Sequence, residues 1–157
     1  MGKGKARLTH LDASGAARMV DVSGKPVMLR RAAARGRIRM KAETLRAVRE
    51  GAVKKGDVLA AARIAAISAA KETARIIPLC HTLPLEMVKV DFAFPEETCV
   101  EVRVATAVTG RTGVEMDALT GAAVALLVIY DMAKAMDRSM VIEEVRLLKK
   151  TKGAPRA

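Results

Sequence analysis

The longest apolar stretch of the chain constrains its fold more than any other segment. Between Ala118 and Ile129 the only residues that are not apolar are Thr120 and Gly121. The stretch belongs to a predicted helix from Val114 to Met136. A helix that is apolar on almost every side has to be buried on most of them, so the rest of the chain must cover it.

The core that covers this helix has to be aliphatic. Hydrophobic residues make up 51% of the 157 residues, but aromatic residues only 2%, namely Phe92, Phe94 and Tyr130. This length favours a single domain over residues 1–157, and the composition excludes disorder of the whole chain. No apolar run reaches the length of a membrane span and no signal peptide is recognisable, so we expect a soluble cytoplasmic protein.

The excess positive charge lies at the two ends of the chain. Residues 1–41 hold eleven Lys or Arg against two Asp, a net of +9, and residues 149–157 add +4, whereas residues 42–148 carry a net of −2. Residues 1–7 and 151–157 are therefore expected to be mobile basic ends. Basic ends are typical of solvated arms, and in some proteins of a surface for nucleic acid or a phosphate-rich ligand.

The first half of the chain predicts one strand and two helices. A short strand over Arg37–Met40 precedes a helix over Lys41–Glu50, which Gly51 ends. Asp57 is a suitable N-cap for a second, alanine-rich helix that continues to Pro78. The many small side chains of this second helix indicate close backbone packing.

The second half predicts a hairpin, the apolar helix and a last strand. Apolar residues alternate over Val88–Phe94 and again over Val100–Val108, with a turn at Pro95–Glu97 between them. A final strand over Met140–Leu148 completes the order β-α-β-β-α-β, with the first helix doubled. This is the ferredoxin-like split βαβ pattern, an α+β fold whose antiparallel sheet has helices packed on one face. Many unrelated functions use this fold.

Two loops carry residues that could transfer protons or bind an anion. His81 follows Cys80 in a loop between Pro78 and Pro84, where a rigid histidine could transfer protons, although a purely structural loop explains the pair as well. Lys55 belongs to a basic turn before Asp57, where free backbone N–H groups favour anions, but a simple capped turn is the alternative.

Both ends of the apolar helix carry charged residues. Asp131 and Lys134 are neighbours at i and i+3, and they fit either an acid/base pair or an ordinary ion pair. At the other end, Glu115, Met116 and Asp117 occupy the first turn, where helix capping accounts for the carboxylates. With two cysteines, Cys80 and Cys99, and two histidines, the chain lacks the usual ligand spacing of a zinc site.

Six motifs occur in a fixed order over almost the whole chain. They are LTHLD (8–12), MVDVSGK (19–25), KGDVLAAARIAAISAAK (55–71), IPLCHTLPL (77–85), TGRTGVEMDALT (109–120) and IYDMAKAMD (129–137). Together they resemble the MoaC-type cyclic pyranopterin monophosphate synthases of molybdenum cofactor biosynthesis, and the resemblance covers residues 8–153.

The resemblance implies a lyase activity. Family members convert (8S)-3′,8-cyclo-7,8-dihydroguanosine 5′-triphosphate, a cyclised GTP, to cyclic pyranopterin monophosphate and pyrophosphate. This reaction needs repeated proton transfers and stabilisation of negative charge, but no redox cofactor, and Mg²⁺ is left open as a companion of the triphosphate. The resemblance also implies a homohexamer, a trimer of dimers, whose sites lie between subunits, and no nucleic-acid or membrane partner.

The resemblance assigns roles residue by residue. It implies that Asp131, Lys134 and Lys55 are catalytic. It implies that the substrate-binding residues are Leu79, Cys80, His81, Glu115, Met116, Asp117, Arg30 and Lys150. Asp117 stands where the family usually has Glu, and the tail KKTKGAPRA lacks the family's Gly-Gly-Lys-Ser-Gly continuation, so Lys152 is not included.

Two other classes of function remain open from the sequence. A nucleic-acid-binding module would use the basic ends, but these contain no aromatic residues on which bases could stack. A regulatory nucleotide-binding domain would need the phosphate-binding residues without the pair of Asp131 and Lys134. Turnover of the cyclised GTP distinguishes these classes from the enzyme.

Overall fold

The computed structural model describes residues 11, 12 and 14–155. Residues 1–7 and the start of the LTHLD motif lie outside them. The elements in chain order are β1 (Met28–Arg39), α1 (Ala42–Arg49), α2 (Val58–Lys71), α3 (Thr73–Ile76), β2 (Met87–Glu96), β3 (Cys99–Gly110), α4 (Glu115–Ala133) and β4 (Val141–Gly153).

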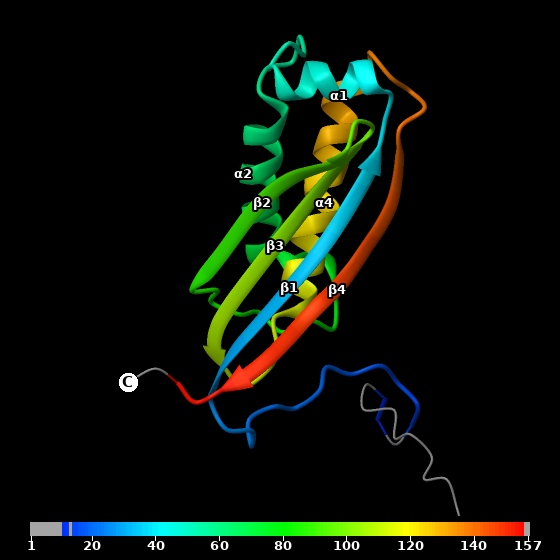
Figure 1. The fold of residues 1–157 in the computed structure, drawn as a ribbon. Helices are drawn as coiled ribbons and strands as arrows, with labels where there is room; N and C mark the ends of the chain where they lie inside the picture. The colour runs from blue at the N-terminus through cyan, green and yellow to red at the C-terminus, as the bar shows by residue number, and fades with distance from the viewer. Residues whose placement is uncertain (1–10, 13, 156–157) are drawn as a thin grey trace, which may run out of the picture.

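The four strands form one antiparallel sheet in the order β2-β3-β1-β4. The helices lie on one face of this sheet, and α2 and α4 pack against each other behind the strands (Figure 1). The structure confirms the ferredoxin-like split βαβ arrangement, including the hairpin of β2 and β3. By length and hydropathy α4 could cross a membrane, yet it is the central helix of this core.

Small residues allow α4 to lie unusually close to its neighbours. A Cβ atom added at Gly36 of β1 would lie 2.7 Å from Cδ1 of Leu126, which is fully buried in α4. A Cβ atom at Gly121 of α4 would lie 3.0 Å from the carbonyl oxygen of Ala66 in α2. Both contacts explain why glycine occupies these two positions of the core.

Two strands are longer than the sequence predicts. β1 begins at Met28 instead of Arg37, because its inward residues at this end are alanines that give no apolar alternation. β4 continues to Gly153 instead of Leu148, and backbone pairing with β1 holds its polar end in the sheet. Residues 151–153 therefore belong to the sheet and not to a mobile basic end, while residues 156–157 lie outside the described part of the chain.

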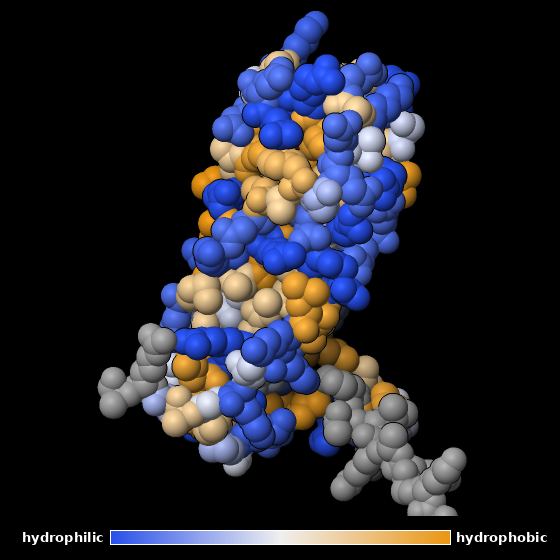
Figure 2. All heavy atoms as spheres, viewed as in Figure 1, coloured by the Kyte–Doolittle hydropathy of each residue, from blue (hydrophilic) through white to orange (hydrophobic). Residues whose placement is uncertain are grey.

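The face of the sheet away from the helices is polar because of a network of ion pairs. Arg35 pairs with Glu144 at 2.8 Å, and Arg39 pairs with Glu96 at 2.9 Å. Arg37 also contacts Glu96. Figure 2, drawn from the same side as Figure 1, shows hydrophilic bands between apolar patches. Three arginines of β1 are therefore balanced by glutamates within the sheet.

We predict that Gly121→Ala lowers the free energy of unfolding by about 1 kcal/mol. Alanine improves helix propensity by about 1 kcal/mol, but overpacking against a backbone oxygen is expected to outweigh this, at about 1–3 kcal/mol. Urea unfolding of the two proteins checks the sign. The control is Ala123→Gly, at a half-buried position of the same helix, which measures the difference in helix propensity between alanine and glycine. A more stable Gly121→Ala variant would contradict the close approach of α4 to α2.

Candidate active site

Three predicted catalytic residues meet at the C-terminal end of α4. Oδ1 of Asp131 accepts a hydrogen bond from Nζ of Lys134 at 2.7 Å, and Oδ2 accepts one from Nζ of Lys55 at 3.0 Å. Nζ of Lys55 also donates to the backbone oxygen of Asp131 at 2.9 Å. Lys55 is remote in sequence, so the fold brings it to the pair that the helical spacing predicts.

The turn before α2 places Lys55 at this position. Oδ1 of Asp57 accepts a hydrogen bond from the backbone N–H of Ala60 at 2.9 Å and so caps α2, as predicted. Gly56 has a φ of +101°, which glycine adopts without strain and which turns the chain back toward α4. Since α2 packs along α4, this capped turn lies against the last turn of α4.

The two lysines keep Asp131 ionised. The hydrogen bond from Lys134, followed by that from Lys55, lowers the pKa of Asp131 to about 2. At neutral pH the cluster therefore consists of one carboxylate between two ammonium groups, and each ammonium keeps N–H donors for a ligand. All three side chains are about half exposed, at 48–57%, so a substrate can reach them.

A second group of predicted residues lies at the N-terminal end of α4. Leu79, Cys80, His81, Glu115 and Met116 line a cavity of about 540 Å³. Nε2 of His81 is 2.8 Å from the backbone oxygen of Val20, and because a carbonyl only accepts, Nε2 carries the hydrogen. In the neutral form of the imidazole, Nδ1 is then an acceptor.

A basic cavity of about 410 Å³ adjoins the first one through Gly113 and Glu115, which line both. It brings Arg30 and Lys150 together, as the resemblance implies. Lys150 pairs with Glu115 at 3.1 Å, and the guanidinium of Arg30 donates to the backbone oxygen of Arg111 at 3.2 Å.

The sequence analysis missed two residues of this basic cavity, Arg31 and Lys152. The alternation of lysine in Lys150-Thr151-Lys152 was the available signal, because residues two apart in a strand face the same side. Lys152 was nevertheless not included, because the tail lacks the continuation that the family has and its segment was predicted to be a mobile end.

Asp117 lies behind the cavities, not among the residues that line them. Its side chain is buried, with 3% of the residue exposed, and Oδ2 has no hydrogen-bond partner among the described residues. Burial raises the pKa of Asp117 to about 6. Burial, with the nearby charge of Asp117, also raises the pKa of the Cys80 thiol, which disfavours Cys80 as a nucleophile. Cys80 and Cys99 are both free thiols.

The two groups of residues stand at opposite ends of α4. Glu115 and Asp131 are sixteen residues apart in one helix, which corresponds to about 24 Å along its axis. A single chain therefore does not bring Asp131 and His81 to one reacting centre.

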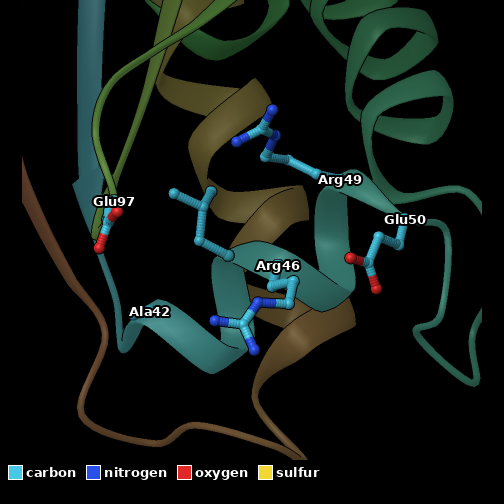
Figure 3. Close-up of a pocket in the computed structure, with 6 residues that line it drawn as sticks. Ala42, Arg46, Arg49, Glu50 and Glu97 are labelled. Carbon is cyan, nitrogen blue, oxygen red and sulfur yellow. The ribbon is translucent and has the colours of Figure 1, made fainter.

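A third cavity contains none of the predicted site residues. It has a volume of about 390 Å³ and lies beside α1, where Arg46 and Arg49 flank it together with Glu97 of the turn between β2 and β3 (Figure 3). The guanidinium carbon of Arg49 stacks 5.0 Å from the ring centre of Phe94. Within the described residues no group of three His, Cys, Asp or Glu side chains could hold a metal ion.

The fold and these residues define an α+β domain with an exposed cluster of one aspartate and two lysines and a separate basic cavity. The chain belongs to the MoaC family, whose model matches residues 19–153. It is 58% identical over 146 residues to a cyclic pyranopterin monophosphate synthase of Novosphingobium aromaticivorans, covering 93% of this chain and 92% of the relative. It is 56% identical over 149 residues to the synthase of Thermomicrobium roseum, covering 94% and 90% of the two chains.

We predict that Asp117→Asn stabilises the protein above pH 6 and has little effect near pH 4. A carboxyl whose pKa rises from 3.8 to about 6 on folding binds more protons in the folded state between these values. The free energy of unfolding therefore falls as the pH rises through this window, by at most about 3 kcal/mol. Asn cannot ionise, so the Asp117→Asn variant does not lose this stability as the pH rises.

Urea unfolding of Asp117→Asn and the parent protein from pH 4 to pH 8 checks this dependence. The exposed Asp91, paired with Lys89 at 2.9 Å, provides the control variant Asp91→Asn, whose curve should run parallel to that of the parent. A constant difference between Asp117→Asn and the parent over the whole range would refute the raised pKa.

Proposed function

We propose that the protein is a cyclic pyranopterin monophosphate synthase, a lyase of molybdenum cofactor biosynthesis. Its substrate would be the cyclised GTP and its products cyclic pyranopterin monophosphate and pyrophosphate. The observation that carries the proposal is the cluster in which Asp131 binds both Lys55 and Lys134. The motifs that form this cluster lie in the part of the chain that aligns with synthases at 58% and 56% identity.

The cluster can move protons during the rearrangement of the purine ring. The Lys55 and Lys134 ammonium groups are proton donors, and Asp131 orients them while it balances their charge. At the other end of α4, Nδ1 of His81 is a proton acceptor when the imidazole is in its neutral form. The proposal thus assigns donors to one cluster and an acceptor to the other.

The basic cavity suits the triphosphate. Arg30 and Lys150 offer charge-assisted hydrogen bonds to phosphate oxygens, and these bonds strengthen as negative charge develops on the departing pyrophosphate. The chemistry requires no redox cofactor from the protein, and any Mg²⁺ would enter with the triphosphate. We place the reaction in the cytoplasm.

We further propose a homohexamer, a trimer of dimers, in which each site combines residues of two subunits. The separation of about 24 Å between the ends of α4 supports this, because Asp131 and His81 can meet only across a subunit interface. Apolar side chains on the edge strand β4 also support an interface between copies. The exposed ones are Val141, Ile142, Val145, Leu147 and Leu148.

The ion pairs on the open face of the sheet disfavour the nucleic-acid-binding alternative. Arg35, Arg37 and Arg39 all contact glutamates, so they offer little free positive charge to a phosphate backbone. The basic cavity beside α4 holds Arg30, Arg31 and Lys152, none of which forms an ion pair with another described residue.

We predict that Asp131→Asn reduces turnover of the cyclised GTP by about 10² to 10⁴. The neutral amide no longer balances the two ammonium groups, whereas the bond from Lys55 to the backbone oxygen of residue 131 remains. Pyrophosphate release measures the reaction. Glu72→Gln, which breaks the exposed i,i+3 pair of Glu72 with Arg75 at 2.8 Å, is the matched control and should keep normal activity. Normal turnover by Asp131→Asn would show that Asp131 and Lys134 form only an ordinary ion pair.

We predict that two inactive variants restore activity when they share one oligomer. Asp131→Asn and His81→Ala damage opposite ends of α4, so a mixed assembly contains sites with one intact end from each chain. Random mixing of equal amounts should recover about a quarter of the normal turnover if sites lie between subunits. Co-expression with two affinity tags isolates the mixed assemblies, and light scattering gives their size. A monomer, or a mixed assembly without activity, would contradict the shared site.

A further inference from the structure

Two cations face each other directly across neighbouring strands in the basic cavity. Arg30 of β1 is the partner of Lys152 of β4 in the antiparallel pairing. Like charges at directly opposite positions repel each other and destabilise a sheet. Among the described residues Lys152 has no ion-pair partner, and Arg30 is bound only to the backbone oxygens of Gly110 and Arg111.

A β-bulge determines that Lys152 points into this cavity. Ala34 pairs with Leu147, but the next residue, Ala33, pairs with Lys149, so Leu148 is an extra residue in β4. The bulge reverses which side chains of β4 face the helices. Lys150 and Lys152 therefore lie on the helix side of the sheet, and the ion pair of Lys150 with Glu115 of α4 confirms this. Without the bulge, Lys149 and Thr151 would lie there.

The cavity carries more positive charge than its single acidic residue can balance. Arg30, Arg31, Lys150 and Lys152 line it with Glu115, which leaves a net of three positive charges. Lys150 and Lys152 are separated by about 7 Å along the strand. This spacing suits an extended anion with charge on more than one group better than a single carboxylate or phosphate.

We propose that Lys152 is a phosphate ligand and that it binds, together with Arg30, the terminal phosphates of the triphosphate substrate. The inference rests on the proposed function. Glu115 and Lys150 stand between the cavity of His81 and the position of Lys152. The ring system therefore occupies the cavity of His81, and the phosphates extend along β4 past Lys150 to Lys152. The two phosphates that leave as pyrophosphate are those between Arg30 and Lys152.

The alternative is that Lys152 is a solvated lysine on an edge strand, where lysine is common. Calorimetric titration of the full chain with inorganic pyrophosphate and tripolyphosphate distinguishes the two. Lys149→Gln is the matched control, because Lys149 is the same residue type on the same strand but faces the opposite side of the sheet. Lys152→Arg, which keeps the charge, tests rescue.

We expect Lys152→Gln to weaken the binding of both anions about tenfold or more, since one charge-assisted hydrogen bond is lost. Lys149→Gln should change binding less than threefold, and Lys152→Arg should retain it. In buffer without phosphate, Lys152→Gln should melt no lower than the parent, because a repulsive pair is removed. Equal losses in Lys149→Gln and Lys152→Gln, or unchanged binding by Lys152→Gln, would overturn the inference.

Turnover separates this inference from the proposed function. If the parent binds pyrophosphate through Lys152 but releases none from the cyclised GTP, the proposed function fails and the anion site remains. If the parent turns over and Lys152→Gln has an unchanged KM, the inference fails and the function remains. We expect a raised KM for Lys152→Gln with the larger part of kcat retained.

Discussion

The close approach of α4 to the sheet and to α2 is the contact on which the rest of the structure depends. Gly36 and Gly121 leave no room for a side chain where α4 meets β1 and α2. Because interiors are packed as densely as crystals, such contacts fix a helix along its whole length. A straight, immobilised α4 then holds two sets of polar residues at its ends, and the basic turn of Lys55 is held with it through α2.

The carboxyl groups at the two ends of α4 have pKa values shifted in opposite directions. At the C-terminal end, two lysines lower the pKa of the exposed Asp131 to about 2. At the N-terminal end, burial raises the pKa of Asp117 to about 6, against the favourable effect expected from the helix dipole. Desolvation therefore dominates at Asp117 and direct ion pairing at Asp131. The difference separates an exposed carboxylate that lies between two lysines from a carboxyl that is shielded from solvent.

Local sequence patterns predicted what depends on local geometry. The i,i+3 spacing of Asp131 and Lys134 and the cap at Asp57 appear in the structure as expected. The start of β1, the extent of β4 and the burial of Asp117 did not follow from local patterns, because each depends on contacts between segments far apart in the chain. The position of Lys152 in the cavity did not follow from local patterns either, since the bulge at Leu148 exists only in the pairing with β1.

The bulge also limits how this part of the chain can change by insertion or deletion. Loss of Leu148 would only remove the bulge, because Lys149 would then follow Leu147 directly and still pair with Ala33. Insertion of one residue before Lys149 would instead move Lys149 and Thr151 to the side of the helices, so that a lysine and a hydroxyl would take the places of the two lysines. Because Lys149 and Lys150 are adjacent, the position of Lys150 would still hold a lysine after such an insertion, whereas the position of Lys152 would not. A family member that is one residue longer here would keep half of the anion site and would need a lysine or arginine at the position of Thr151 to regain the rest.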